Sequence, residues 1–345
     1  MPFELERTYG LRADYWYRLQ NLSPNTTQQR FFESSPDNET QKFLDKSDEI
    51  SNSFIWQTIR NLGTKMLSPI YPKTDVIGIL GSGNMFLFSE QQLSKFIGID
   101  KSNWDATNKT VLDLGAGNGN ITEYMRGFYN KVYATELSPV SEFEVIFVKK
   151  RKSQKMRNRL TSKGYTILDA LEWANVEGIH FDLITAFNLI DRHYSPTTLL
   201  NDLYRASTRS NCPVIVSLVL PVIHYVEYNP SGKSTDPDKM MQIYGQTYSE
   251  QAHSMIVNVF QPAGFEVVRW TRLPYLCEGE THYPVYYLPD AVFLLKPIKP
   301  KPNAFAERPV DVSIPEATSN LNITTLYASI REQSTSDYSS AFESP

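Results

Sequence analysis

A glycine-rich turn carries the residues whose types and spacing most clearly indicate chemistry. Asp113 stands two positions before Gly115. Gly117 and Asn118 follow, and we expect a helix to begin near Asn120. Glycines let the backbone approach a ligand closely, and a helix N-terminus offers unbonded N–H groups. A dinucleotide-binding turn would need a third glycine where Asn120 stands. The acid at Asp113 instead suits S-adenosylmethionine, a positively charged ligand whose methionyl amine this carboxylate can help to hold.

Two further acids stand where they could contact an adenosine. Glu136 ends the next apolar run, and an acid at such a strand end can accept both ribose hydroxyls. A glutamate alone is more often a surface residue, but at this distance from the glycine turn Glu136 is a functional candidate. Asp169 follows a third run and could reach the adenine amino group. An ordinary loop position is an equal alternative for Asp169.

Asn188 and Asp191 follow a fourth apolar run. In a doubly wound fold, ligands bind outside the carboxyl ends of the strands, so both side chains are expected to face the transferred methyl group. Enzymes that methylate amide or exocyclic amine nitrogens often carry Asn-Pro-Pro-Tyr here. Because this motif is absent, such nitrogens are less favoured as methyl acceptors. A salt bridge to Arg192 or a helix N-cap is an equal alternative for Asp191.

The elements that must position these residues form an alternating pattern from Thr110 onward. Short apolar runs alternate with helical stretches, which is typical of βαβ units and a parallel sheet. Prolines between the last two runs argue against a crossover helix, so we expect that pair to be antiparallel. The fold class predicted is α/β, a class I S-adenosylmethionine-dependent methyltransferase fold. It is a Rossmann-like seven-stranded sheet with a terminal antiparallel hairpin. The seven runs are Thr110–Leu114, Lys131–Thr135, Tyr165–Leu168, Phe181–Phe187, Cys212–Leu220, Glu266–Arg272 and Ala291–Lys296.

The chain is expected to have three parts. Residues 1–100 form a mostly helical N-terminal extension without strand alternation, in which Ser89 caps a helix over Glu90–Phe96. Residues 101–297 form the methyltransferase domain. Residues 298–345 are rich in Pro, Ser, Thr and charge without apolar periodicity, so a disordered tail is expected.

The composition of the chain limits which partners and which cellular location are expected. The net charge of −4 gives no general attraction to phosphate backbones, so no nucleic-acid partner is expected. Two cysteines and five scattered histidines show no metal-ligand spacing, so no metal site is expected. No run approaches the ~20 apolar residues that span a bilayer, and the first residues do not resemble an export signal. A cytoplasmic location is therefore the default expectation.

Several strings together resemble one family, the DREV methyltransferases, over roughly residues 40 to 297. The most specific of them is Arg272–Gly279, which is more informative than the glycine turn. The others are Leu44–Ser47, Gly83–Ser89, Leu112–Gly117, Tyr133–Ser138, Asn188–Arg192, Leu218–Pro221 and Tyr225–Glu227.

The resemblance implies a protein-histidine N-pros-methyltransferase acting on His-x-His motifs with a small middle residue. Its cofactor would be S-adenosylmethionine and its partners would be proteins that carry such motifs. Asp191 would accept the distal ring N–H, and Asn188 would help to orient the ring. Tyr275 and Tyr286 would line the acceptor pocket between the last two strands, although tyrosines there could also simply pack. The resemblance also raises endomembrane association as an alternative location.

Two positions depart from the family pattern. The family has an acid where Asn118 stands, and an amide there is expected to tune cofactor binding without abolishing it. Ser141–Lys155 has no family counterpart and is interpreted as an atypical insertion, close enough to Glu136 to disturb the cofactor site. A catalytically silent methyltransferase-fold binding module is therefore one alternative function. A methyltransferase for a small molecule or another protein nitrogen is the other.

Overall fold

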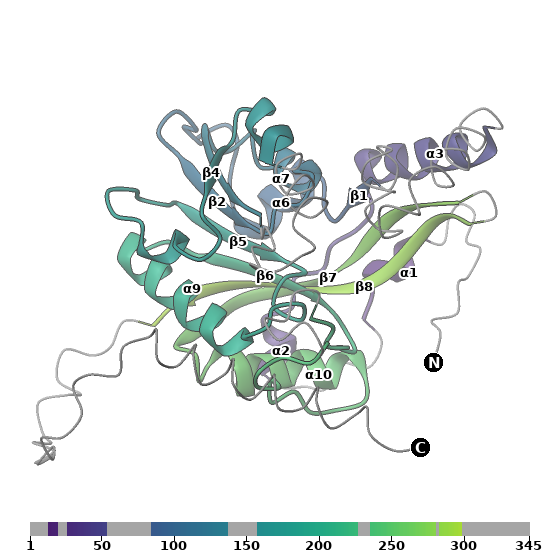
Figure 1. Ribbon diagram of the computed structural model, residues 1–345. Helices are drawn as coiled ribbons and strands as arrows, with labels where there is room; N and C mark the ends of the chain where they lie inside the picture. Colours follow the sequence, from purple (N-terminus) through teal and green to yellow (C-terminus); the bar gives the residue numbers. More distant parts are fainter. Residues whose placement is uncertain are drawn as a thin grey trace, which may run out of the picture. The chain divides into compact units, whose positions relative to one another are not determined.

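The computed structural model describes residues 13–19, 26–53, 84–136, 157–226, 235–280 and 283–298. The predictions for the 141–155 insertion and for the tail after residue 298 lie outside these residues. Among those described, eight strands form one mixed sheet in the order β1-β7-β8-β6-β5-β2-β3-β4 (Figure 1). The five strands β4, β3, β2, β5 and β6 are parallel, and the remaining pairs are antiparallel. The predicted α/β class with its terminal antiparallel hairpin is confirmed.

The central strands form where apolar runs were predicted. They are β2 (Thr110–Leu114), β3 (Lys131–Thr135), β4 (Thr166–Leu168), β5 (Leu183–Phe187) and β6 (Val214–Val219). All residues of β2 and β5 are buried, as expected for parallel strands covered by helices on both faces.

The terminal hairpin is much longer than the two predicted runs. It comprises β7 (Phe265–Glu280) and β8 (Tyr283–Pro297). The prolines between the two runs were interpreted as evidence against a crossover helix, and the structure places Pro274 and Pro289 inside the strands themselves. Pro274 stands opposite Pro289, and the Pro289 carbonyl accepts from Leu220 N on the β6 side. The backbone groups of this pair therefore point away from each other, and the missing N–H groups break no bond between β7 and β8. Tyr275 and Tyr286 therefore lie on paired strands and not in a loop.

The N-terminal region contributes a strand that was not predicted. β1 (Met85–Phe86) pairs antiparallel with β7 at the edge of the sheet, with Met85 opposite Cys277. Two residues are too few to show the alternation by which strands are recognised. The predicted cap is confirmed, since Ser89 accepts a hydrogen bond from Gln92 N at the start of α6 (Glu90–Ile97).

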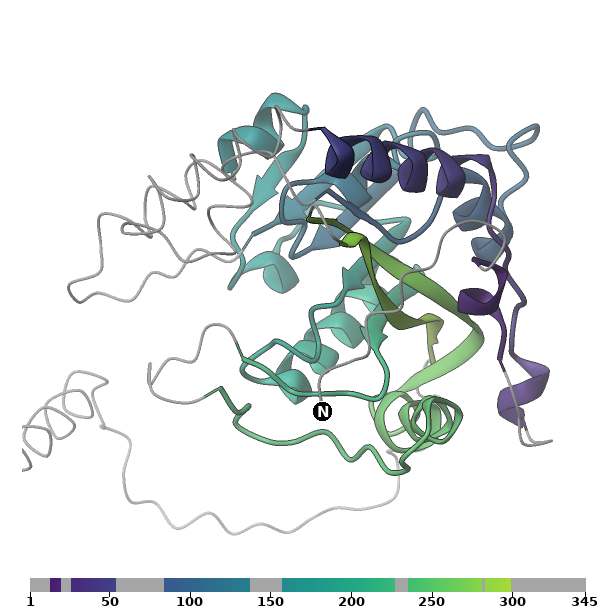
Figure 2. The ribbon, with the colours of Figure 1, turned by 90° about the vertical axis from the view of Figure 1, so that its right-hand side faces the viewer.

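Helices cover both faces of the sheet. On one side lie α9 (Pro196–Ser210) and α10 (Tyr248–Ser254), the latter continuing into the π-helical turn Met255–Phe260. On the other lie α1 (Asp14–Tyr17), α3 (Asn38–Asn52) and α6, and Figures 1 and 2 show α3 and α10 on opposite sides of the hairpin. The shorter helices are α2 (Thr26–Gln29), α7 (Asn120–Glu123), a helical segment over 157–162, and a 3₁₀ turn at Trp173–Asn175. No helix in the described ranges combines the length and apolarity needed to cross a bilayer.

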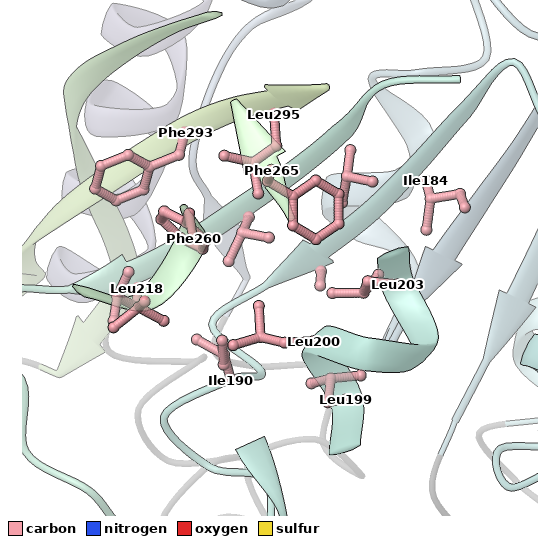
Figure 3. Packing of buried hydrophobic residues seen from close by; sticks show 14 of the residues in the cluster. Ile184, Ile190, Leu199, Leu200, Leu203, Leu218, Phe260, Phe265, Phe293 and Leu295 are labelled. Atoms are coloured by element: carbon pink, nitrogen blue, oxygen red, sulfur yellow. The ribbon is translucent and has the colours of Figure 1, made fainter. Parts of the chain in front are cut away.

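Two hydrophobic cores result from strand alternation. Val214, Val216 and Leu218 of β6 face the α9 side, whereas Ile215 faces the α6 side. Figure 3 shows the first core, where Leu199, Leu200 and Leu203 come from α9 and Phe260 lies beside Phe293 of the sheet. In β2, Asp113 follows the parity of Val111, which belongs to the α6-side core. Its carboxylate is therefore directed to the face on which the glycine turn leads into α7.

Candidate functional site

The glycine turn needs glycine for two separate reasons. Gly115, Gly117 and Gly119 all have positive φ angles, of 70°, 56° and 72°. A Cβ at Gly119 would also lie 2.8 Å from the side chain of Leu160, and one at Gly115 would lie 3.1 Å from Leu189. The first contact packs the turn against the helical segment over 157–162. The second packs it against the loop that follows β5.

Three backbone N–H groups tie the turn to the end of β3. Gly115 N donates to Thr135 Oγ1 at 3.2 Å, and Ala116 N donates to the Thr135 carbonyl at 3.0 Å. Gly117 N donates to Glu136 Oε2 at 2.9 Å. The sequence-predicted pair of glycine turn and Glu136 is thus in direct contact. A carboxylate has about four acceptor positions, so this bond leaves capacity for hydroxyl donors.

Asp113 lies at the base of the turn and is 2% exposed. Its Oδ2 accepts from Thr122 Oγ1 at 2.5 Å, and its Oδ1 accepts from Thr185 Oγ1 at 2.7 Å. Burial raises the pKa of Asp113 to about 6, while the two hydroxyl hydrogen bonds act in the opposite direction. The two threonines were not identified from the sequence, because one is on α7 and the other is on β5.

A cavity opens above Asp113. It is bordered by the turn, by Phe187 at the end of β5 and by Tyr275 of β7. Its lining residues are Met85, Asp113, Gly115, Ala116, Gly117, Asn118, Ile121, Phe187 and Tyr275. A cavity with a buried carboxylate at its base and backbone at its wall fits a ligand that carries an ammonium group.

Asn118 connects the turn to the N-terminal part of the chain. Its Oδ1 accepts from Asn120 N at 3.0 Å, and Asn120 Nδ2 donates to Asn84 Oδ1 at 2.9 Å. Asn84 N in turn donates to Glu278 Oε2 at 3.2 Å. These bonds join the start of α7 to the β1–β7 edge, and with it Met85 in the cavity wall.

Asp169 lies apart from this cavity. Its side chain is exposed, and Oδ1 accepts from Leu171 N at 2.8 Å within the turn after β4. Its carbonyl accepts from Trp173 N at 3.0 Å. Asp169 is thus held by local turn bonds and is absent from the residues that line the cavity.

A polar cluster (Asn188, Asp191, Ser217 and Asp290) lies where β5, β6 and β8 meet. Asn188 adopts a left-handed φ of 49°, and its backbone N donates to the Ser217 carbonyl at 2.9 Å. Its Nδ2 donates to Asp290 Oδ2 at 2.9 Å. Within the described part of the chain, the buried Oδ1 of Asn188 has no hydrogen-bond partner. This oxygen can therefore accept a hydrogen bond from a ligand in a buried site.

Asp290 was not predicted. It is fully buried on β8, opposite Val219 of β6 and Leu273 of β7. Its pKa is raised to about 8, mainly by burial; hydrogen bonds from Ser217 and Asn188 act against this rise, and the nearby Asp191 charge contributes to it. The signal in the sequence was an acid directly before the apolar run Ala291–Lys296.

Asp191 is 7% exposed, and its carbonyl accepts from Tyr225 N at 3.2 Å. The N-cap alternative is wrong, because α9 begins at Pro196 with Ser195 at its cap. Asp191 and Asp290 influence each other electrostatically, so the polar cluster brings two carboxyl groups into one buried site.

The two tyrosines differ in position. Tyr275 is 8% exposed, lines the cavity and donates from its hydroxyl to Met85 Sδ at 2.6 Å. Burial raises its pKa, and the charges of Asp290 and Asp191 contribute in the same direction. Tyr286 is half-buried and stands opposite Cys277, on the hairpin face that Tyr275 and Asp290 share by alternation. Tyr275 thus connects the cavity to the polar cluster, whereas Tyr286 is not among the lining residues.

The proteins whose solved structures match this chain are named for different activities. A candidate RNA methyltransferase from Pyrococcus horikoshii is 11% identical, with a TM-score of 0.37 over 70% of this chain and all of the other. Magnesium protoporphyrin IX methyltransferase from Synechocystis PCC 6803, solved with bound S-adenosylmethionine, is 12% identical, with a TM-score of 0.32 over 76% of this chain and 99% of the other. The [4+2]-cyclase SpnF is 12% identical, with a TM-score of 0.35 over 70% and 97%.

The family profile of the DREV methyltransferases matches residues 16–297, which include the glycine turn, the polar cluster and the whole hairpin. Membership of a methyltransferase family supports S-adenosyl-L-methionine as the cofactor, in agreement with a cavity that has Asp113 at its base. The chain belongs to the DREV methyltransferase family and is an S-adenosylmethionine-dependent methyltransferase.

Proposed function

We propose that the protein methylates the pros nitrogen of histidine in His-x-His motifs of protein substrates. The observation that carries this proposal is the buried Asn188 Oδ1, an acceptor without a partner in the described residues, in the same cluster as Asp191. Both groups accept hydrogen bonds and neither carries a positive charge. Such a site suits an acceptor that donates one N–H and presents a lone pair elsewhere.

A neutral imidazole has these two properties. Its unperturbed pKa is ~6.5, so near pH 7 one ring nitrogen carries a lone pair and the other an N–H. If the distal nitrogen donates to Asp191 or to Asn188 Oδ1, the pros nitrogen is left with the lone pair. Fixing the tautomer and aligning the ring for in-line displacement is then the main task of the protein.

The methyl transfer requires no reactant other than S-adenosylmethionine and the imidazole. S-Adenosylmethionine supplies the methyl group on a positively charged sulfur. The pros nitrogen forms the new bond to carbon with its own lone pair, while the pair of the sulfur–carbon bond stays on sulfur. The positive charge passes to the ring, where the Asp191 carboxylate stabilises it, and the distal proton can then leave to this carboxylate or to solvent.

The cofactor roles belong to the same proposal. Asp113 would hold the methionyl amine, and Glu136 would accept ribose hydroxyls beside its bond to Gly117. Gly115 and Gly117 would allow close approach of the ligand, with Asn118 at the wall of the cavity. Asp169 would accept the adenine amino group with Oδ2, while its Oδ1 is engaged with Leu171 N. Tyr275 and Tyr286 would line the acceptor side.

The test is transfer of label from S-adenosylmethionine to a His-x-His peptide, followed by hydrolysis and identification of the methylated amino acid. The expected product is N-pros-methylhistidine, and Asp191→Asn should lower the rate at least about tenfold, since a lost charge-assisted hydrogen bond is worth ~1.5–3 kcal/mol. Asp202→Asn is the matched control, because Asp202 pairs with Arg205 on the outer surface of α9.

Two results would overturn the assignment. Label on another nitrogen or on a small molecule would identify a different methyltransferase. Binding of S-adenosylmethionine without any transfer would favour the silent binding module.

A further inference from the structure

Asp290 occupies an unusual place for an acid. The side chain is fully buried in the middle of β8, opposite the last residue of β6, and the Asp290 backbone carbonyl accepts the Tyr248 hydroxyl at 2.8 Å. Its Oδ2 accepts Asn188 Nδ2 at 2.9 Å. An ionised carboxyl in such a site is costly, and hydrophobic packing does not require an acid there. Its presence inside the polar cluster therefore calls for another explanation.

The bond between Asn188 and Asp290 determines what Asn188 offers to a ligand. A side-chain amide has one donor end and one acceptor end. Oδ2 of the Asp290 carboxyl accepts from the donor end, and it can do so whether the group is ionised or carries its proton on Oδ1. The acceptor end of Asn188 is the one that remains, and it is buried without a partner in the described residues. With no carboxylate at position 290, the amide could turn and present its NH₂ group instead.

We infer that Asp290 is a positioning residue that fixes the Asn188 amide so that Oδ1 accepts a hydrogen bond from the methyl acceptor. The inference rests on the proposed function for the identity of the acceptor, a ring N–H donor. Asp290 itself contacts Asn188 and need not touch the acceptor. The charged and titratable groups that influence the same site are Asp191, Arg192, Tyr248, Tyr275 and Cys277.

Two variants test this role, and the second of them exchanges the two partners. Asp290→Leu places an apolar side chain at the buried position and removes the acceptor for Asn188 Nδ2. Asn188→Asp with Asp290→Asn reverses the hydrogen bond, so that Nδ2 at position 290 donates to a carboxylate at position 188. That carboxyl group keeps an acceptor oxygen toward the site, and the number of acidic groups in the cluster does not change. Aspartate also tolerates the left-handed backbone at position 188.

The measurements are kcat and KM for the His-x-His peptide, the dissociation constant for S-adenosylmethionine by calorimetry, and the melting temperature. Asp290→Leu should lower kcat/KM for the peptide at least tenfold and leave cofactor affinity within twofold. The exchanged double variant should recover to within about threefold of the wild type. Asp182→Asn is the control, because Asp182 bonds Lys109 and Thr110 N at the opposite end of β2 and should change stability only.

Two outcomes would overturn the inference. One is an Asp290→Leu protein with wild-type kcat/KM. The other is a double variant that melts like the wild type yet stays as slow as Asp290→Leu.

A measurement without acceptor separates this inference from the proposed function. In ¹⁵N spectra of selectively labelled protein, the Nδ2 protons of Asn188 should exchange slowly with solvent in the wild type and at least tenfold faster in Asp290→Leu. Equal exchange in both would sink the positioning role. Product analysis of the wild type alone decides whether histidine is the acceptor, and so either claim can fail while the other stands.

Discussion

Asp113 is a buried acid whose protonation state decides what it can bind. Burial places its pKa at about 6, so the group is mostly ionised at pH 7 and mostly neutral at pH 5. The ionised form attracts the ammonium group of S-adenosylmethionine. Affinity should therefore fall as the pH drops through 6, approaching tenfold per pH unit below it. Calorimetric titrations between pH 5 and 8 measure this dependence.

Asp113→Asn is the comparison for that titration. The amide carries no charge, so affinity should be weaker at pH 7 and nearly independent of pH over the same range. A wild-type affinity that does not change between pH 5 and 7 would contradict the assignment of Asp113 to the amine.

At the residue scale, the sequence revealed only part of the site. Gly115, Gly117 and Glu136 follow from local spacing, because one strand, one turn and the next strand suffice to bring them together. Asp290 could not be predicted in the same way, since its contact with Asn188 joins residues 102 positions apart. Its importance arises from a pairing between β6 and β8 that local sequence does not encode.

At the scale of the element, replacing a glycine in the turn before α7 should lower the stability of the protein, and this loss can be measured. A Cβ at Gly119 meets Leu160 at 2.8 Å and requires a left-handed backbone, whereas Gly178 has a similar φ with nothing within 4 Å of its Cβ. Gly178→Ala should cost about 1–2 kcal/mol from backbone strain. Gly119→Ala should cost at least about 1 kcal/mol more because of overpacking. Urea unfolding of both variants measures the difference, and equal losses would contradict the packing role.

The strands show which elements sequence patterns can define. β2 and β3 have the bounds predicted, because each is a short, largely apolar run that follows a polar turn. The hairpin exceeds its prediction because Pro274 and Pro289 face each other, and one proline does not reveal its partner. β1 was missed because its two residues become a strand only when β7 pairs with them.

The stability of the whole molecule should depend on pH through Asp290. Its folded pKa of about 8 lies above the ordinary value of 3.8, so at pH 7 the folded state holds a proton that the unfolded state has released. Stability is then lost as the pH rises toward 8, at up to ~1.4 kcal/mol per pH unit. Burial lowers the pKa of His193 and of His224 below 6.5, so these groups titrate at lower pH and do not mask the effect.

Urea unfolding at pH 7 and pH 8.5 tests this dependence. The wild type should lose about 1 kcal/mol over the interval, and Asp290→Asn should lose little. Asp182→Asn should retain the wild-type slope. A slope that persists in Asp290→Asn would assign the titration to another group.

The two-residue strand β1 has a consequence for the order in which the protein is made. Met85 supplies a wall of the cavity and accepts the Tyr275 hydroxyl from 190 residues farther along the chain. During synthesis the glycine turn leaves the ribosome long before β7 exists. Closing so long a separation is a slow, non-local step. The cavity is therefore completed only after the last hairpin has formed, and a nascent chain that already has its central strands still lacks a finished cofactor site.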